Sequence, residues 1–256
     1  LLFRFLMQAE ADFNIRIAMA EGGDLRNAIP REAWAIVLVP ELKKYEFEAF
    51  VRNYESVYRA EFAETEPDLS FNCENVAVPE KVISKDEQYK IIRAVYVCPN
   101  GVIRMSQSMK GLVETSNNLA IVRCKEGKFE AYNLTRSSVD TAKESTAWRV
   151  AAAFQLIDAS VVLEGSYPGW KPNMKSPILK TMVNVYKSKF GEEPEVKAIH
   201  AGLECGIIGG VYPGLDMISL GPTIKFPHSP DEKVHIPSVN KFFDFLCEIL
   251  GEIPAK

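Results

Sequence analysis

Apolar side chains recur every three or four residues in several stretches of the chain, which is the spacing of an amphipathic helix. The same spacing predicts helices at 1–11, 84–98, 140–158, 177–190 and 238–251. The clearest stretch is 40–64, where one helical face carries Leu42, Phe47, Phe50, Val51, Tyr54, Val57 and Tyr58. Ser84 precedes Glu87 with the spacing of a capping box, and Ser176 precedes Pro177 as a helix cap and first helical residue.

Runs of β-branched and aromatic residues predict strands between these helices. The order helix-strand-strand-helix-strand occurs twice, over about 1–80 and 84–167, with an extra strand in the second copy. This predicts two related half-domains. Asn117 and Asn118 interrupt one of the strands, which favours a turn or bulge there. The predicted strands are 12–23, 33–40 and 69–78 in the first copy, and 101–107, 112–124, 128–138 and 160–168 in the second.

The stretch 167–177, YPGWKPNMKSP, contains three prolines and a glycine and predicts a domain boundary. Beyond it, helices alternate with apolar stretches, of which 195–199 and 215–222 are typical of buried strands. Alternation of this kind favours a mostly parallel layer of strands with helices. The predicted fold class is therefore α/β, in two domains.

Composition narrows the class of protein. The 256 residues are 47% hydrophobic and 25% charged, with a net charge of −4, which fits a globular protein without the basic clusters of a nucleic-acid binder. No apolar run reaches the roughly 18 residues that span a membrane. The five cysteines are scattered, so we expect reduced thiols and a cytoplasmic protein. The first residues read as the inside of a helix, and we expect a fragment of a longer protein.

Histidine and glutamate positions in the second domain could carry chemistry. His228 lies in the Pro-rich stretch FPHSPDE, where a metal ligand is one interpretation and an ordinary surface histidine the other. His200 and Glu204 have i, i+4 spacing, but a glycine lies between them and a metal pair needs a continuous helix, so that signal is weak. His235 has no supporting context. Glu204 stands in a stretch of low charge, where a buried carboxylate needs a cation such as a substrate ammonium.

Arg136 follows a predicted strand and precedes a predicted helix, beside Ser137 and Ser138. Its planar guanidinium suits a carboxylate ligand, and the alternative is a helix-capping segment with an exposed arginine. The sequence contains no nucleophile elbow, P-loop, HExxH motif or redox CxxC pair. Residue spacing alone therefore leaves the reaction open.

Several motifs, taken in order along the chain, resemble those of bacterial aminoacyl-histidine dipeptidases. These are cytosolic Xaa-His dipeptidases in the larger family of di-zinc exopeptidases that includes carnosinases, aminoacylases and glutamate carboxypeptidases. The resemblance extends over nearly the whole chain. The motifs are RNAIPREA (26–33), VETSNNLA (113–120), RSSVD (136–140), SYPGWKPN (166–173), HAGLECG (200–206), YPGLDMISLGP (212–222) and HSPDE (228–232).

The resemblance implies a lid domain over 1–171, built of two ferredoxin-like halves, and the C-terminal part of a catalytic domain over 172–256. It implies that His228 is a zinc ligand. Arg136 and Asn118 would reach the substrate carboxylate and the scissile carbonyl oxygen, and Glu204 would receive the dipeptide amino terminus. The general base and the other ligands of two zinc ions are expected upstream, so this chain alone should be inactive and should hold no catalytic zinc.

Three hypotheses follow from the sequence. The first is an Xaa-His dipeptidase, in which zinc-activated water attacks the peptide bond and an N-terminal catalytic segment is the missing partner. The second keeps the fold but changes the substrate to an N-acyl amino acid or another amide. The third is a non-catalytic ferredoxin-like interaction module, for which a second copy of the chain, in a homodimer, is a candidate partner.

Overall fold

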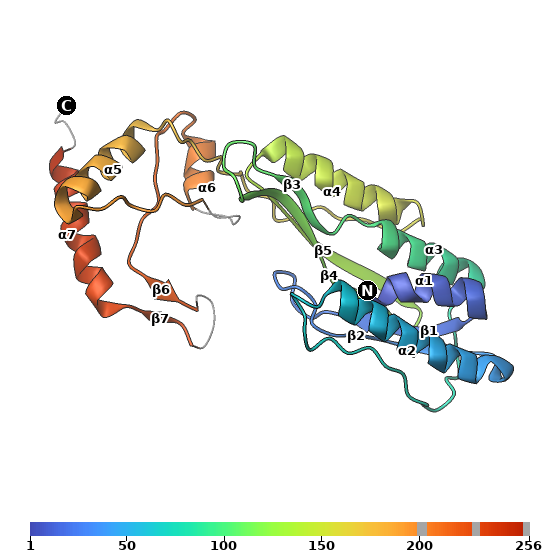
Figure 1. Cartoon of the computed structure of the whole chain (residues 1–256). Helices are drawn as coiled ribbons and strands as arrows, with labels where there is room; N and C mark the ends of the chain where they lie inside the picture. Colours follow the sequence, from blue (N-terminus) through green and yellow to red (C-terminus); the bar gives the residue numbers. More distant parts are fainter. Residues whose placement is uncertain (199–203, 227–230, 253–256) are drawn as a thin grey trace. The chain divides into compact units, whose positions relative to one another are not determined.

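The computed structural model describes residues 1–198, 204–226 and 231–252 (Figure 1). They form two compact units: unit 1 consists of 1–104, 115–136 and 141–164, and unit 2 of 105–114, 137–140 and the residues from 165 onward. Helices and strands are mixed along the chain, so the predicted α/β class is confirmed. No helix in these described ranges is long and apolar enough to cross a membrane. The assignment of 1–171 to a lid and 172–256 to a catalytic domain stays a prediction.

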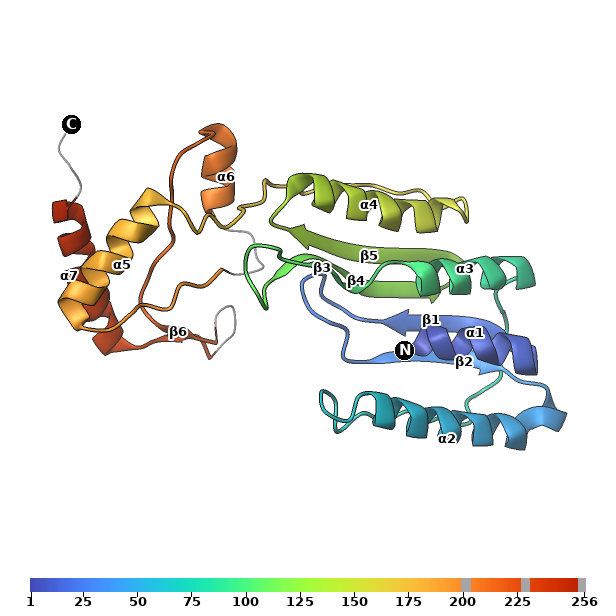
Figure 2. The same ribbon diagram turned by 45° about the horizontal axis from the view of Figure 1, so that its top comes forward.

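A five-stranded sheet with a layer of helices forms unit 1. The strand order is β2-β1-β4-β3, β5 also pairs with β4, and β1 is antiparallel to both β2 and β4. In Figure 2, α1 and α3 lie over the strands on the viewer's side. The strands are β1 (Arg16–Gly22), β2 (Ala33–Leu38), β3 (Gly101–Met105), β4 (Val113–Lys125) and β5 (Lys128–Ser137), and the helices are α1 (Leu2–Phe13), α2 (Lys44–Glu61), α3 (Lys85–Val97) and α4 (Asp140–Gln155).

Two apolar cores lie between this sheet and its helices. The first joins α1, α2 and β1, and its aromatic rings meet edge to face, as Phe5 does with Tyr54 and Tyr58 with Phe71. The second joins α3, α4 and β4 around Phe154. Phe3 of α1 and Ile91 of α3 pack against both cores, so all four helices belong to the layer on the same side of the sheet.

The predicted apolar stripe over 40–64 is confirmed in α2, except at the exposed Val57, but not before that helix. Phe47, Val51, Tyr54 and Tyr58 are buried on the face toward the sheet. Leu42 is 99% exposed, because it belongs to a short 3-10 turn, Glu41–Lys43, that precedes α2. The capping prediction for α3 is also confirmed: the Ser84 hydroxyl accepts a hydrogen bond from the backbone N–H of Glu87 at 3.2 Å.

The predicted closing strands of the two halves, 69–78 and 160–168, are wrong, since both stretches are without regular structure. Some of their apolar residues pack on the two cores instead: Leu69 and Phe71 pack against the first core, and Val161 packs against the second. A strand also needs a neighbour that exchanges backbone hydrogen bonds with it. Within the described ranges, neither stretch belongs to a sheet.

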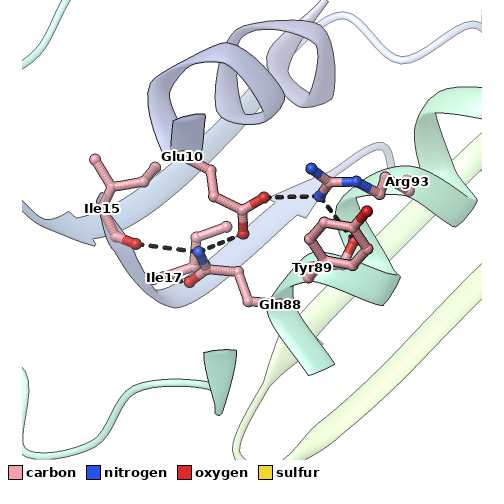
Figure 3. A network of polar contacts seen from close by, with 6 residues as sticks. All are labelled: Glu10, Ile15, Ile17, Gln88, Tyr89 and Arg93. Atoms are coloured by element: carbon pink, nitrogen blue, oxygen red, sulfur yellow. Dashed lines mark hydrogen bonds and ion pairs between the residues drawn. The ribbon is translucent and has the colours of Figure 1, made fainter. Parts of the chain in front are cut away.

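One edge of β1 is closed by α3 rather than by a strand. β1 pairs with β4 only from Ala20 to Gly22, and Ile17 lies beyond that ladder. The backbone N–H of Ile83 donates to the Ile17 carbonyl at 2.8 Å. The Ile17 N–H donates to the side-chain oxygen of Gln88 at 2.7 Å (Figure 3). The segment that leads into α3 and the first turn of α3 therefore satisfy the backbone of β1 where the sheet leaves it open.

From residue 165 onward, the described part of unit 2 contains three helices and one short hairpin. They are α5 (Pro177–Phe190), α6 (Glu204–Val211), α7 (Ile236–Glu252), β6 (Ile224–Lys225) and β7 (Lys233–Val234). The predicted cap of α5 is confirmed: the Ser176 hydroxyl accepts a hydrogen bond from the backbone N–H of Leu179 at 3.1 Å. The helix ends at Gly191, whose φ of 71° is readily adopted by glycine. Helices α5 and α7 pack together around Met182 and Ile249.

The predicted parallel layer in this part of the chain is wrong for the described residues. The stretches 195–198 and 215–222 form no strand, and β6 and β7 are antiparallel. Parallel strands require hydrogen-bonded neighbours supplied through crossover connections, and the described residues of unit 2 supply none. Apolar side chains in this region, such as Leu215 and Leu220, are correspondingly exposed.

Candidate active site

A buried polar network in β4 and β5 positions two of the predicted site residues. Asn117, only 2% exposed, donates through Nδ2 to the Pro99 carbonyl at 2.7 Å and to Oδ1 of Asn133 at 2.8 Å. The Thr135 hydroxyl donates to Asn117 Oδ1 at 2.8 Å. The amide of Asn117 thus has partners on both its nitrogen and its oxygen. Strand β4 runs unbroken through it, so no turn forms at Asn117 and Asn118; the alternative prediction of a bulge there stays a prediction.

This network also shows which way the neighbouring side chains point. Cys98, at the end of α3 and in the second core, contacts Asn133, so Asn117 and Thr135 lie on the face toward the helices. Successive side chains of a strand point to opposite faces of the sheet. Asn118 and Arg136, each one residue further along its strand, therefore share the open face. The structure thus places these two predicted residues on the same face of neighbouring strands.

Arg136 has the charge and the freedom to bind an anion. It is half-buried near the end of β5, and its guanidinium forms no hydrogen bond or ion pair with any residue that the structure describes. A guanidinium offers five N–H donors in a planar fork that matches a carboxylate with two parallel hydrogen bonds. Arg136 can therefore receive a carboxylate without giving up an existing contact.

Asn118 is already engaged by the chain itself. Its Nδ2 donates to the carbonyl of Ala28 at 2.7 Å and, more weakly, to that of Arg26 at 3.4 Å. Both carbonyls belong to the connection between β1 and β2. A side-chain amide nitrogen has two hydrogens, so in this arrangement neither is left for a substrate carbonyl.

In unit 2, Glu204 is the first residue of α6 and is exposed to solvent. A carboxylate in the first turn of a helix is favoured by the positive end of the helix dipole. Because Glu204 is exposed, its carboxylate does not pay the desolvation cost that a buried carboxylate would. It therefore needs no neighbouring cation to be stable. Glu204 remains accessible to a positively charged group.

A hollow of about 320 Å³ lies within unit 2 beside α6. Glycines of α6 form one wall and the segment 168–171 forms another. The approach is close: a Cβ atom on Gly206 would lie 2.5 Å from the Pro168 carbonyl oxygen. Two carboxylates that line the hollow accept backbone hydrogen bonds. Asp140 accepts one from the N–H of Gly169 and Asp216 accepts one from the N–H of Ile178, both at 2.9 Å.

The predicted zinc ligand cannot be located in the structure, because His228 and His200 lie outside the described residues. In the sequence, His228 falls between β6 and β7. His235 is described and exposed, and its carbonyl accepts hydrogen bonds from Ser238. Among the described residues no three His, Cys, Asp or Glu side chains come together in a way that could hold a metal ion. The described donors therefore do not fit a zinc site by themselves.

Sequence reasoning missed Asp216 and the hydrogen-bonding role of Asn117. Asp216 is separated from its partner Ile178 by 38 positions, so no local spacing signals the contact. In the sequence, Asn117 stands out only as a polar residue in an otherwise apolar predicted strand. An asparagine at such a position indicates a buried network when its neighbours on the adjacent strand are also polar, as Asn133 and Thr135 are.

Comparison with known proteins shows which class of enzyme the chain resembles. Over its whole length the chain is similar to dipeptidases, enzymes that hydrolyse peptide bonds, and the predicted resemblance to them is confirmed. It is 40% identical to the cytosol non-specific dipeptidase of Escherichia coli (strain K12), with 100% of this chain and 53% of the relative aligned. The crystal structure of the aminoacylhistidine dipeptidase from Vibrio alginolyticus superimposes with a TM-score of 0.92 at 38% identity, covering 100% of this chain and 52% of the other. The chain thus spans about half the length of these relatives. No family model matches it.

Proposed function

We propose that this chain is the substrate-binding part of a dipeptidase, with Xaa-His dipeptides as the substrate class. The observation that carries the proposal is Arg136, an arginine without a partner among the described residues, on the open face of a rigid sheet. The motif in which it lies resembles that of aminoacyl-histidine dipeptidases, and the two relatives named above are dipeptidases. The name of the Escherichia coli relative also supports a cytosolic location for this protein.

In this proposal two charged side chains recognise the two ends of a free dipeptide. Arg136 binds the C-terminal carboxylate by a pair of charge-assisted hydrogen bonds. Glu204, exposed at the start of α6, offers a carboxylate to the N-terminal ammonium. A longer peptide has an amide in place of one of these charges, so recognition of both ends restricts the enzyme to dipeptides.

Hydrolysis itself needs groups that the described residues do not provide. Because these residues do not fit a metal site, we derive no step that passes through zinc. We propose that His228 is one ligand, and that the other ligands and the general base come from a catalytic segment outside this sequence. On this basis the 256-residue chain binds no zinc stoichiometrically and does not hydrolyse dipeptides alone.

The test replaces Arg136 by Met in the full-length protein that contains this sequence. Loss of a charge-assisted pair of hydrogen bonds should raise KM for dipeptides by roughly 10- to 100-fold with a smaller change in kcat. Arg149, an exposed arginine on α4, provides a matched control, and Arg149→Met should leave KM unchanged. An unchanged KM in Arg136→Met would remove Arg136 from carboxylate binding.

A further inference from the structure

The connection between β1 and β2, residues 23–32, is held on β4 at two points. Gly23 has a φ of 77°, and a Cβ atom at this position would lie 1.9 Å from the carbonyl oxygen of Ala120, so the backbones touch. Further along, the carbonyls of Arg26 and Ala28 accept hydrogen bonds from Asn118. Figure 2 shows this connection at the end of the sheet where β3 and β4 lie. The connection is therefore a fixed loop, held by backbone contacts.

The fixed loop and Arg136 belong to the same face of the sheet. Asn118 and Arg136 occupy the open face of neighbouring strands, as the hydrogen bond between Thr135 and Asn117 on the opposite face requires. Cross-strand neighbours on one face lie about 5 to 8 Å apart. Asn118 contacts the loop backbone directly, so the loop lies over the same face of the sheet that carries Arg136.

The loop exposes apolar side chains although its backbone is fixed. Leu25 is 63% exposed and Ile29 is 82% exposed. Exposed apolar side chains on an anchored loop are typical of a binding site. Such side chains do not stabilise the fold, because they are not buried, and the anchored backbone holds them in one position. Arg136 on the same face suggests the occupant: a residue whose carboxylate binds the arginine would have its side chain on the face of the sheet that the loop covers.

We propose that the loop 23–32 forms one wall of the subsite for the side chain of the dipeptide's C-terminal residue, and that Asn118 is a positioning residue which holds this wall. The inference rests on the proposed function for its ligand, but the anchoring of the loop stands independently. It also gives Asn118 a different task from direct contact with the scissile carbonyl, because both of its amide hydrogens point to the loop.

Anchoring is tested on the 256-residue chain by limited trypsin digestion, since Arg26 and Arg31 are cleavage sites within the loop. Asn118→Ala removes the hydrogen bonds, and Gly23→Ala forces the loop off Ala120 without changing Asn118. Both should speed cleavage at these sites by at least about tenfold. Gly101→Ala is the matched control, because Gly101 also has a positive φ but has open space around it. Cleavage of Asn118→Ala at the wild-type rate would overturn the anchor.

The subsite is tested in the full-length protein by the ratio of kcat/KM for Ala-His to that for Ala-Gly. Asn118→Ala and Gly23→Ala should lower this ratio to a similar extent, and the double variant should lower it no further, because both changes release the same loop. If Asn118 contacts the scissile carbonyl instead, Asn118→Ala will slow both substrates equally and Gly23→Ala will change neither; that result overturns the subsite. If the wild-type full-length protein hydrolyses no dipeptide, the proposed function is wrong and the subsite proposal fails with it. The trypsin digestion still tests separately whether Asn118 and Gly23 hold the loop.

Discussion

The side-chain oxygen of Gln88 accepts the backbone N–H of Ile17 at 2.7 Å, at a position where β1 has no hydrogen-bonded strand on that side. Gln88 Nε2 donates to the carbonyl of Ile15 at 3.1 Å and to Glu10 at 2.9 Å. The amide thus bonds the backbone on both sides of residue 16, as a peptide group of a neighbouring strand would. Glu10 in turn accepts from Arg93 of α3 at 2.7 Å (Figure 3). One side chain joins α1, β1 and α3.

Replacing Gln88 by Leu should lower the free energy of unfolding of unit 1 by about 2 to 4 kcal/mol. The new side chain leaves the Ile17 N–H and the Ile15 carbonyl buried without partners, and each such group costs about 1 to 3 kcal/mol. Urea denaturation followed by circular dichroism measures the change. Gln155→Leu is the matched control, because Gln155 is an exposed residue of α4, and its effect should stay below about 0.5 kcal/mol. Equal stabilities of the two variants would contradict the role of Gln88.

Helices and their caps could be predicted from the sequence because they depend on contacts within a few residues. The Ser84 and Ser176 caps are examples, since each hydroxyl meets a backbone N–H three positions later. The closing strands could not be predicted, because a strand depends on a neighbour that may be distant in sequence. Residues 69–78 have strand composition, yet only their first residues pack inward, on the first core.

The candidate site also has features that the sequence could predict and features that it could not. Arg136 and Asn118 were identified by motif resemblance, and the structure adds that they share one face of the sheet. The hydrogen bonds from Asn118 to the loop span 90 and 92 positions, so no spacing in the sequence could reveal them. The assignments of His228, Glu204 and the other site residues stay predictions.

Gly206→Ala should displace α6 from the segment that precedes α5. An added Cβ would lie 2.5 Å from the Pro168 carbonyl oxygen, and overpacking of this kind costs about 1 to 3 kcal/mol. Hydrogen exchange of the α6 amides should then become faster by about five- to 100-fold, if they exchange by local opening. Gly221→Ala is the control, because its Cβ would meet open space, and exchange there should not change. Unaltered exchange in Gly206→Ala would show that the close contact does not hold α6.

Replacing Asn117 should lower the free energy of unfolding, although Asn117 is not proposed to contact the substrate. In Asn117→Leu, the Pro99 carbonyl and the Thr135 hydroxyl lose their buried partner, and we expect a decrease of about 2 to 4 kcal/mol in the free energy of unfolding. Asn118→Leu, one residue further on the open face, should cost less, about 1 to 1.5 kcal/mol, because its carbonyl partners can turn to water. Thermal denaturation of the two variants compares them directly, and a larger loss at Asn118 would contradict the assignment of faces.

The buried thiols should be unreactive in the folded protein and should make its stability depend on alkaline pH. Burial raises the pKa of Cys98 to about 12 and, as the larger of two causes, that of Cys124 to about 11. At pH 8 roughly one Cys98 side chain in ten thousand is then a thiolate, the reactive form. A thiol whose pKa is raised by folding holds its proton more tightly in the folded state. The stability associated with this is complete below the ordinary thiol pKa of about 9 and is lost as pH rises toward the folded values.

The free energy of unfolding should therefore fall between about pH 9 and pH 11 in the wild type, and less so in Cys98→Ala/Cys124→Ala, which lacks both titrations. Labelling with a thiol reagent at pH 8, followed by peptide mass spectrometry, checks the reactivity directly. Cys247, which is exposed on α7, serves as the internal reference and should react within the folded protein. Cys98 and Cys124 should react only after denaturant is added, and labelling of Cys98 at the rate of Cys247 in the folded chain would contradict its burial against the second core.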